Sequence, residues 1–138
     1  MDRRRLIAAV RKSLQVERFG EPAEVSIVLT DDERIRELNR DYRATDRATD
    51  VLAFSQLEGQ AVRPEDETVA RGDVVVSAET AKRQAAEGAH SLADELDLLV
   101  VHGVLHLLGY DDETEAGAGE MRQHEKKILD ELRHGRAT

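Results

Sequence analysis

Apolar side chains recur along the chain with two different periods, and each period predicts a type of element. Near the start they recur at helical spacing, with Leu6 and Ile7 followed three or four residues later by Val10, and Val10 followed four residues later by Leu14. This spacing places them on one face of a helix, so an amphipathic helix is expected over about 3–18. In EVSIVLT (24–30) every second residue is apolar instead, and this alternation predicts a strand.

A second helix is predicted directly after that strand. Thr30 and Glu33 have the spacing of a capping box, in which the two side chains bond to free N–H groups at the start of a helix. The helix should then cover about 31–42. Within it, Ile35 and Leu38 are expected to face inward.

The middle of the chain predicts two further strands with a loop between them. VLAF (51–54) has the pattern of a short buried strand. Residues 55–70 lack periodicity and contain Gly59 and Pro64, so they are expected to form a mobile loop. The apolar run in GDVVVSA (72–78) is typical of a central strand, which neighbours cover on both sides.

The second half of the chain predicts helices. Ser77 can cap a helix over about 78–88. A last, polar helix is expected over about 117–134. Its inner stripe should consist of Met121, Ile128, Leu129 and Leu132.

Between these two helices the sequence predicts a buried one. Ser91 and Asp94 have capping-box spacing, and a helix should follow over about 92–108. From Leu96 onward it is apolar on every side, which is typical of a helix enclosed by the rest of the protein. Gly109 can end it in a left-handed conformation. Three strands among five helices indicate an α+β or layered α/β fold, in a single domain spanning residues 1–138.

Composition and charge narrow the possible functions. The chain has no cysteine, which excludes disulfides and thiolate metal sites, and no apolar stretch approaches the length of a membrane span. We therefore expect a soluble cytoplasmic protein with no membrane partner. A net charge of −9 argues against general binding to polyanions, and DNA is not expected as a partner. Residues 1–18 nevertheless carry +4, so a nucleic acid would have to meet a local basic surface.

The strongest candidate for chemistry is VHGVLHLLGYDD (101–112), which contains two of the five histidines. His102 and His106 are four residues apart, so a helix places both rings on one face. Asp112 follows a glycine-permitted turn and can add a carboxylate. Two imidazoles and one carboxylate form a set of metal ligands that leaves a position open to water, as in catalytic zinc sites.

Two other interpretations of this stretch compete with a metal site. Two core histidines could each be bonded to a neighbour, but burying both imidazoles in so apolar a helix is costly unless each has a partner, and a metal ion would serve both. The spacing also invites a zinc protease, which carries a catalytic glutamate directly after the first histidine. Here that position is Gly103, which argues against a protease and leaves room for a bulky substrate.

A second group of candidate residues lies in LNRDYRATDRATDVLAF (38–54). Arg40, Arg43 and Arg47 can bind phosphate oxygens in pairs through their planar guanidinium groups. The aspartates that alternate with them also fit a solvated charged face with no binding function, and composition alone favours that simpler interpretation.

Taken together, these segments resemble the YbeY family of bacterial endoribonucleases and rRNA maturation factors. The family pattern L-N-x-x-Y-R-x-x-D-x-x-T-D-V-L-S-F corresponds to residues 38–54, and G-D-I-x-I-S corresponds to 72–77. The histidine motif H-G-x-L-H-L-x-G-Y-D-H corresponds to 102–112. A methionine and a glutamate of the last helix correspond to Met121 and Glu125.

The resemblance implies a zincin-like α+β fold, in which a small mixed sheet packs against about five helices and a buried helix binds the metal. It also implies one zinc ion, cleavage of single-stranded RNA, and a role in maturing the 3′ end of the small-subunit (16S) rRNA and in ribosome quality control. The rRNA and the small ribosomal subunit or its proteins are then the expected partners. The family roles fall on His102 and His106 as metal ligands, with His102 and Arg43 as catalytic residues.

This chain departs from the family pattern where the chemistry is concentrated. The third histidine of the family motif is Asp112 here. A carboxylate can bind zinc, but it lowers the net charge of the ion, which becomes a weaker Lewis acid, and it tolerates Mn²⁺ or other hard ions better. Asp111 is the alternative ligand, or a residue that orients a histidine ring.

Two functions remain open from the sequence. In the first, the metal assists cleavage of a phosphodiester, and Arg43 stabilises charge on the phosphate. Thr49 and Asp50 then shape the mouth of the cleft and help hold Arg43. Arg40 or Arg47 guides RNA. In the second, the protein is a metal-stabilised, RNA-binding ribosome assembly factor with little or no nuclease turnover. The loss of the third histidine favours this alternative more here than in a three-histidine relative.

Overall fold

The structure is a computed structural model that describes residues 3–20, 23–55 and 70–137. The mobile loop predicted over 55–70 lies almost entirely outside these residues. Eight elements follow one another along the described chain: α1 (Arg3–Val16), β1 (Ala23–Thr30), α2 (Asp32–Arg43), β2 (Val51–Ser55), β3 (Ala70–Ser77), α3 (Ala78–Glu87), α4 (Leu92–Leu107) and α5 (Glu115–Ala137). Each was predicted as the same type of element, and the α+β class is confirmed.

The three strands form a mixed sheet with the order β1-β3-β2. β3 pairs with β1 in parallel and with β2 in antiparallel orientation, so that Val74 is opposite both Ile27 and Ala53. Val74 and Val76 are completely buried. The apolar run therefore forms the central strand, as its sequence predicted.

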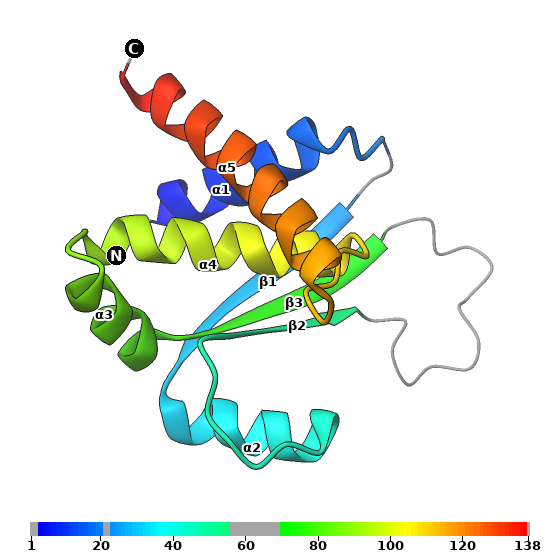
Figure 1. Cartoon of the computed structure of the whole chain (residues 1–138), viewed down its shortest axis with the longest axis vertical. Coiled ribbons are helices and arrows are strands. Elements are labelled where there is room, and N and C mark those ends of the chain that lie inside the picture. Colours follow the sequence, from blue (N-terminus) through cyan, green and yellow to red (C-terminus); the bar gives the residue numbers. More distant parts are fainter. Residues whose placement is uncertain (1–2, 21–22, 56–69, 138) are drawn as a thin grey trace.

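Helices cover both faces of this sheet. Figure 1 shows α4 along one face and α2 along the other, with α1 and α5 packed on the far side of α4. The main core lies around α4, which contributes Val100, Val101, Val104 and Leu105, all completely buried. This enclosure explains why α4 is apolar on all sides. Among the described residues, no helix combines the length and the apolar character that crossing a bilayer requires.

Two glycines allow α4 and the sheet to approach closely. A Cβ at Gly103 would lie 2.5 Å from Cγ1 of Val74, and a Cβ at Gly72 would lie 2.7 Å from Cδ2 of Leu107. The expectation that Gly103 leaves room for a substrate is therefore wrong. The space beside it is filled by strand side chains, Val74 and Val51.

The helix ends follow the predicted chemistry with one exception. The hydroxyls of Ser77 and Ser91 accept hydrogen bonds from the third residue of their helices, as expected of N-caps. At α2 the cap is Asp31, whose carboxylate accepts from the N–H of Arg34, and not Thr30. The strand extends through Thr30 and pairs it with Ser77, so the helix begins one residue later.

The last helix is longer than its sequence pattern indicated. It begins two residues before the predicted range of 117–134 and ends three residues after it. Its predicted inner stripe is nevertheless confirmed, because all four apolar residues are buried. Within the same stripe lies one buried carboxylate, Glu125.

Candidate metal centre

The two histidines of α4 lie on one side of the helix, where their rings meet. The Nε2 atoms of His102 and His106 are 3.0 Å apart, and the ring centroids are 4.7 Å apart. The side chains are 25% and 30% exposed, so both can be reached from solvent. The i, i+4 spacing therefore places both rings on one face of α4, as predicted from the sequence.

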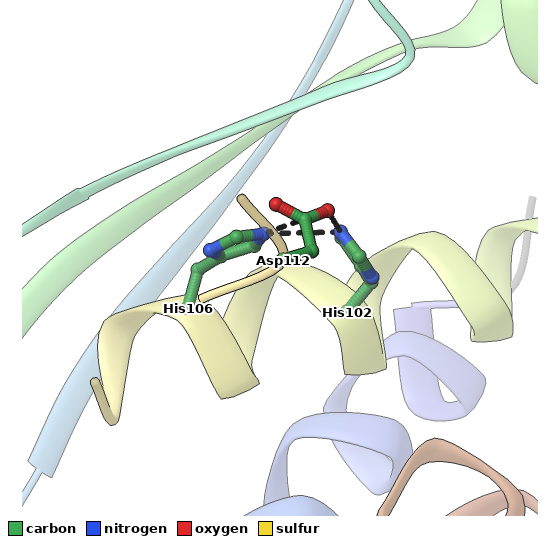
Figure 2. A group of neighbouring side chains, drawn as sticks. All are labelled: His102, His106 and Asp112. Atoms are coloured by element: carbon green, nitrogen blue, oxygen red, sulfur yellow. Dashed lines mark hydrogen bonds and ion pairs between the residues drawn. The ribbon is translucent and has the colours of Figure 1, made fainter. Parts of the chain in front are cut away.

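The turn after α4 brings a carboxylate to the same place. Gly109 has a φ of +103°, which a glycine adopts at little cost, and the chain reverses there. The Oδ2 atom of Asp112 lies 3.5 Å from Nε2 of His102 and 3.8 Å from Nε2 of His106. Figure 2 shows the carboxylate between the two rings. The three side chains form a group that can hold a metal ion.

The separations in this group fit a small divalent ion. A tetrahedral zinc ion with bonds of about 2.0–2.1 Å holds its ligand atoms roughly 3.3–3.4 Å apart. The three donor atoms are 3.0, 3.5 and 3.8 Å apart. Nitrogen and carboxylate oxygen are also donors that zinc and manganese both accept. The residues present therefore fit a metal ion without a change in the backbone.

A buried carboxylate from α5 binds the other nitrogen of His102. Nδ1 of His102 is hydrogen-bonded to Oε1 of Glu125. Burial of the ring lowers the pKa of His102, but the hydrogen bond and charge of Glu125, with the charges of Asp112 and Asp50, raise it more. The net result is a pKa above the ordinary value. The contact with Glu125 therefore holds the orientation of the His102 ring and also favours its protonated form.

His106 has a different electrostatic environment. Burial lowers the pKa of its ring, and the neighbouring His102 lowers it further. The charges of Asp112 and Asp111 oppose this effect without reversing it. Burial and His102 both favour the neutral ring, the form in which histidine binds a metal.

Asp111 does not belong to the group of donor atoms found among the described residues. Its Oδ1 accepts a hydrogen bond of 2.9 Å from the backbone N–H of Glu113, which shapes the loop that carries Asp112. The geometry therefore favours Asp112 over Asp111 as the third candidate ligand.

A cluster of three side chains holds the same loop from the opposite side. The hydroxyl of Tyr110 donates to Oε1 of Glu17 at 2.5 Å. Nδ1 of His124 lies 2.7 Å from the other oxygen of Glu17. The hydrogen bond to Glu17 raises the pKa of Tyr110 to about 12. The cluster ties the loop to the end of α1 and to α5.

The remaining histidines lie outside the group. His124 is half-buried and bonded to Glu17. His90 is exposed and lies 2.5 Å from a carboxylate oxygen of the buried Glu95. His134 is exposed.

Arg43 lies near the outer edge of the sheet. It ends α2, and its guanidinium donates a 2.6 Å hydrogen bond to the carbonyl of Ala53 in the edge strand β2. The guanidinium carbon is 4.9 Å from the ring centroid of Phe54. In Figure 1 the C-terminal ends of α2 and α4 point toward the same end of the sheet, on opposite faces. As the last residue of α2, Arg43 thus lies toward the same end of the sheet as the C-terminal end of α4.

The other predicted substrate-binding residues surround the start of β2 and the end of α2. Thr49 donates a 3.4 Å hydrogen bond to Asp50, whose other oxygen accepts from Gln84. The negative charge of Asp50 contributes to raising the pKa of the His102 ring. Arg40 and Arg47 are exposed, and Arg40 pairs with Asp41 at 3.4 Å.

The sequence reasoning assigned no role to two residues of this region, although it had matched Glu125 to a glutamate of the family pattern. Glu125 had a detectable signal, because it is a charged residue at helical spacing within the apolar stripe of α5. Glu17 had none, since its contacts to Tyr110 and His124 join residues 93 and 107 positions apart.

The chain is similar to known proteins in sequence and in fold. The sequence model of the family described as "Endoribonuclease YbeY" matches residues 2–133. Proteins of that name from Pelotomaculum thermopropionicum and Desulforamulus reducens are each 47% identical, covering 92% and 91% of this chain and 84% and 82% of their own. The solution structure of TM1509 from Thermotoga maritima is similar with a TM-score of 0.58 and 28% identity, covering 96% of this chain and 84% of that one.

Proposed function

The chain belongs to the YbeY family of endoribonucleases, and we propose that it cleaves single-stranded RNA with the help of one bound metal ion. His102, His106 and Asp112 hold this ion. The observation that supports the proposal most directly is their grouping, which brings three donor atoms together within reach of solvent. The whole chain, residues 1–138, acts as one domain.

The chemistry divides between the ion and the side chains around it. A bound zinc ion supplies a Lewis acid beside the scissile phosphate. Arg43 supplies a delocalised positive charge that stabilises the charge developing on the phosphate oxygens. Its hydrogen bond to Ala53 holds the arginine side chain at the edge of β2 before substrate arrives. His102 acts as a ligand and orients the reacting centre.

The substrate must overcome repulsion from a protein with a net charge of −9. Arg40 and Arg47, exposed near the end of α2, bind phosphates of the strand. Thr49 and Asp50 shape the entrance to the cleft. The basic helix α1 guides RNA toward the molecule, and this guidance weakens as salt increases.

The cellular role in this proposal is maturation of the 3′ end of the small-subunit (16S) rRNA and ribosome quality control. The partners are then rRNA and the small ribosomal subunit or its proteins, in the cytoplasm. The family name supports an RNA substrate, and the local basic residues support recognition of a strand by its phosphates.

A second candidate function follows from Asp112. Because a carboxylate replaces the third histidine of the family motif, a bound ion is a weaker Lewis acid here. The protein would then be a metal-stabilised, RNA-binding assembly factor with little or no turnover. In that case the ion holds the loop after α4 against the helix.

A cleavage assay separates the two functions. Purified protein is incubated with end-labelled single-stranded RNA, with and without a chelator, and zinc is then restored. We expect cleavage that the chelator abolishes and zinc restores, and that His106→Ala reduces by at least about 100-fold. His134→Ala is the matched control, because that histidine is exposed on α5. Unfolding by the chelator without any cleavage by the untreated protein would favour the assembly factor.

A further inference from the structure

We propose that Glu125 is a positioning residue for the candidate metal centre, which presents Nε2 of His102 to the ion by holding a proton on Nδ1. The inference rests on the metal-dependent function proposed above, and it assigns a role to a residue of α5 that lies outside the group of ligands. Its basis is the hydrogen bond between Oε1 of Glu125 and Nδ1 of His102.

The hydrogen bond determines which nitrogen of His102 is available. A neutral imidazole carries one proton, and a carboxylate can only accept. Glu125 therefore selects the tautomer with the proton on Nδ1, which leaves the lone pair on Nε2. That atom faces Nε2 of His106 and Oδ2 of Asp112. The same contact makes Nε2 more basic and hence a stronger donor to a metal.

Glu125 is a buried carboxylate in the otherwise apolar inner stripe of α5. Glu125 is 9% exposed and lies in the stripe that contains Met121 and Ile128. Among the described residues of α5, it is the only charged residue that is buried. Burying a carboxylate is costly unless a partner compensates its charge. An apolar residue would pack at this position without that cost, so packing alone does not account for a glutamate.

The other buried carboxylates of the described chain follow the same rule. Asp97 binds Arg5, and Glu95 binds His90. Asp97 thereby joins α4 to α1, and Glu95 joins α4 to the segment that precedes it. Glu125 alone among the three is directed at a candidate metal ligand.

Two substitutions separate positioning from packing. Glu125→Gln keeps the shape and an oxygen that can accept from Nδ1, but it removes the charge. Glu125→Leu removes both and adds an apolar side chain to an apolar stripe. We expect zinc affinity to fall about tenfold in Glu125→Gln and toward 100-fold in Glu125→Leu, the range typical for partners of metal-binding histidines. Glu131→Gln, exposed on the same helix, is the matched control and keeps the wild-type affinity.

The measurements are zinc affinity by competition with a chromophoric chelator, and the His102 tautomer by ¹⁵N NMR of the metal-free protein at alkaline pH. We expect the wild type to hold the proton on Nδ1 and Glu125→Leu to lose this preference while remaining as stable as the wild type in urea. A merely structural glutamate would alter stability and leave the tautomer and the order of affinities unchanged.

The possible failures are distinguishable. If the wild type binds zinc and Glu125→Gln and Glu125→Leu bind it equally well, the positioning role is wrong and the metal centre stands. If the wild type itself binds no divalent ion, the proposed metal centre is wrong and the inference falls with it. If the wild-type tautomer carries its proton on Nε2, the inference is overturned whatever the affinities are.

Discussion

Asp112 gives the group of candidate ligands a negative charge that three imidazoles would not have. With two histidines and one aspartate, a divalent ion keeps a net charge of +1. It should attract electrons from a phosphate less strongly, and the oxygen donor should favour hard ions more than an imidazole does. The identity of this one residue therefore bears on both metal preference and turnover.

Asp112→His should shift metal preference toward zinc. We expect the ratio of the Mn²⁺ dissociation constant to the Zn²⁺ dissociation constant to rise roughly tenfold, equivalent to about 1.4 kcal/mol. Competition titrations with both ions measure it. Asp111→Asn is the matched control, because its carboxylate contacts the backbone of Glu113. A larger effect of Asp111→Asn than of Asp112→Asn on zinc affinity would assign the ligand to Asp111.

Gly103→Ala should destabilise the protein despite the higher helix propensity of alanine. The added Cβ would lie 2.5 Å from Val74, a buried residue whose branched side chain cannot easily turn away. We expect the free energy of unfolding to fall by about 1–3 kcal/mol, as in other overpacked cores. Urea denaturation measures it. In Gly119→Ala, where the added Cβ has only Arg122 at 3.7 Å, we expect unchanged or slightly increased stability.

The candidate ligands could be predicted from the sequence because their signal is local. Two histidines four residues apart share a helix face, and a glycine followed by an aspartate reverses the chain toward them. Glu125 could not be assigned to His102 in the same way, because its partner lies 23 residues away on another helix. The clash that makes Gly103 necessary was likewise invisible, since it involves a strand 29 positions earlier.

A cluster of polar contacts around Asp32 joins α2 to α3. This first residue of α2 accepts hydrogen bonds from Ser77 and Thr80 at the start of α3, at 2.5 and 2.6 Å. Arg83 binds its other oxygen at 2.8 Å. Hydrogen bonds from Ser77, Thr80 and Arg83, in that order, lower the pKa of Asp32 from 3.8 to about 2.

The pH dependence of stability should report this link between α2 and α3. Because the pKa is lowered in the folded protein, the stabilisation is complete above pH 3.8 and is lost as pH falls toward 2. Asp32→Asn should be less stable than the wild type at pH 7, and the difference should shrink between pH 4 and 2. Asp130→Asn, exposed on α5, should keep the wild-type profile. A constant difference across this range would contradict the prediction.

Elements could be predicted better than their ends. Hydrophobic period determines which residues are buried, so every predicted helix and strand of the described chain was found. The residue at which an element ends depends on competition between neighbouring elements for the same residues. Thr30 had the correct side chain to cap α2, but pairing with β3 extended the strand through it and left the cap to Asp31.

The arrangement of the layers could not be predicted from the sequence. Local patterns did not indicate that α2 and α4 would lie on opposite faces of the sheet, nor that Arg43 would reach the edge strand from the other side. Both depend on the strand order, which contacts between distant segments determine. As a result, the C-terminal ends of α2, with the arginine of the family motif, and of α4, with the histidines, lie toward the same end of the sheet in different layers.

The position of the end of α2 predicts which positive charges contribute to RNA binding. In an acidic molecule, phosphates should be bound where arginines are exposed, and Arg40 and Arg47 are exposed near the end of α2. Arg40→Gln combined with Arg47→Gln should therefore reduce the slope of log K against log salt by about 0.7 for each phosphate of a single strand that these arginines neutralise. Arg34→Gln is the matched control. It lies at the opposite end of α2 and pairs with Glu37 at 3.1 Å.

The measurement is binding of a labelled single-stranded RNA at several salt concentrations, with cleavage rates at saturating RNA measured alongside. The double variant should bind more weakly and cleave at the wild-type rate once saturated, because these arginines bind phosphates away from the scissile bond. A decrease of the slope in Arg34→Gln that is half of the decrease in the double variant, one charge against two, would mean that RNA responds only to total charge. The position of α2 relative to the site would then have no part in substrate recognition.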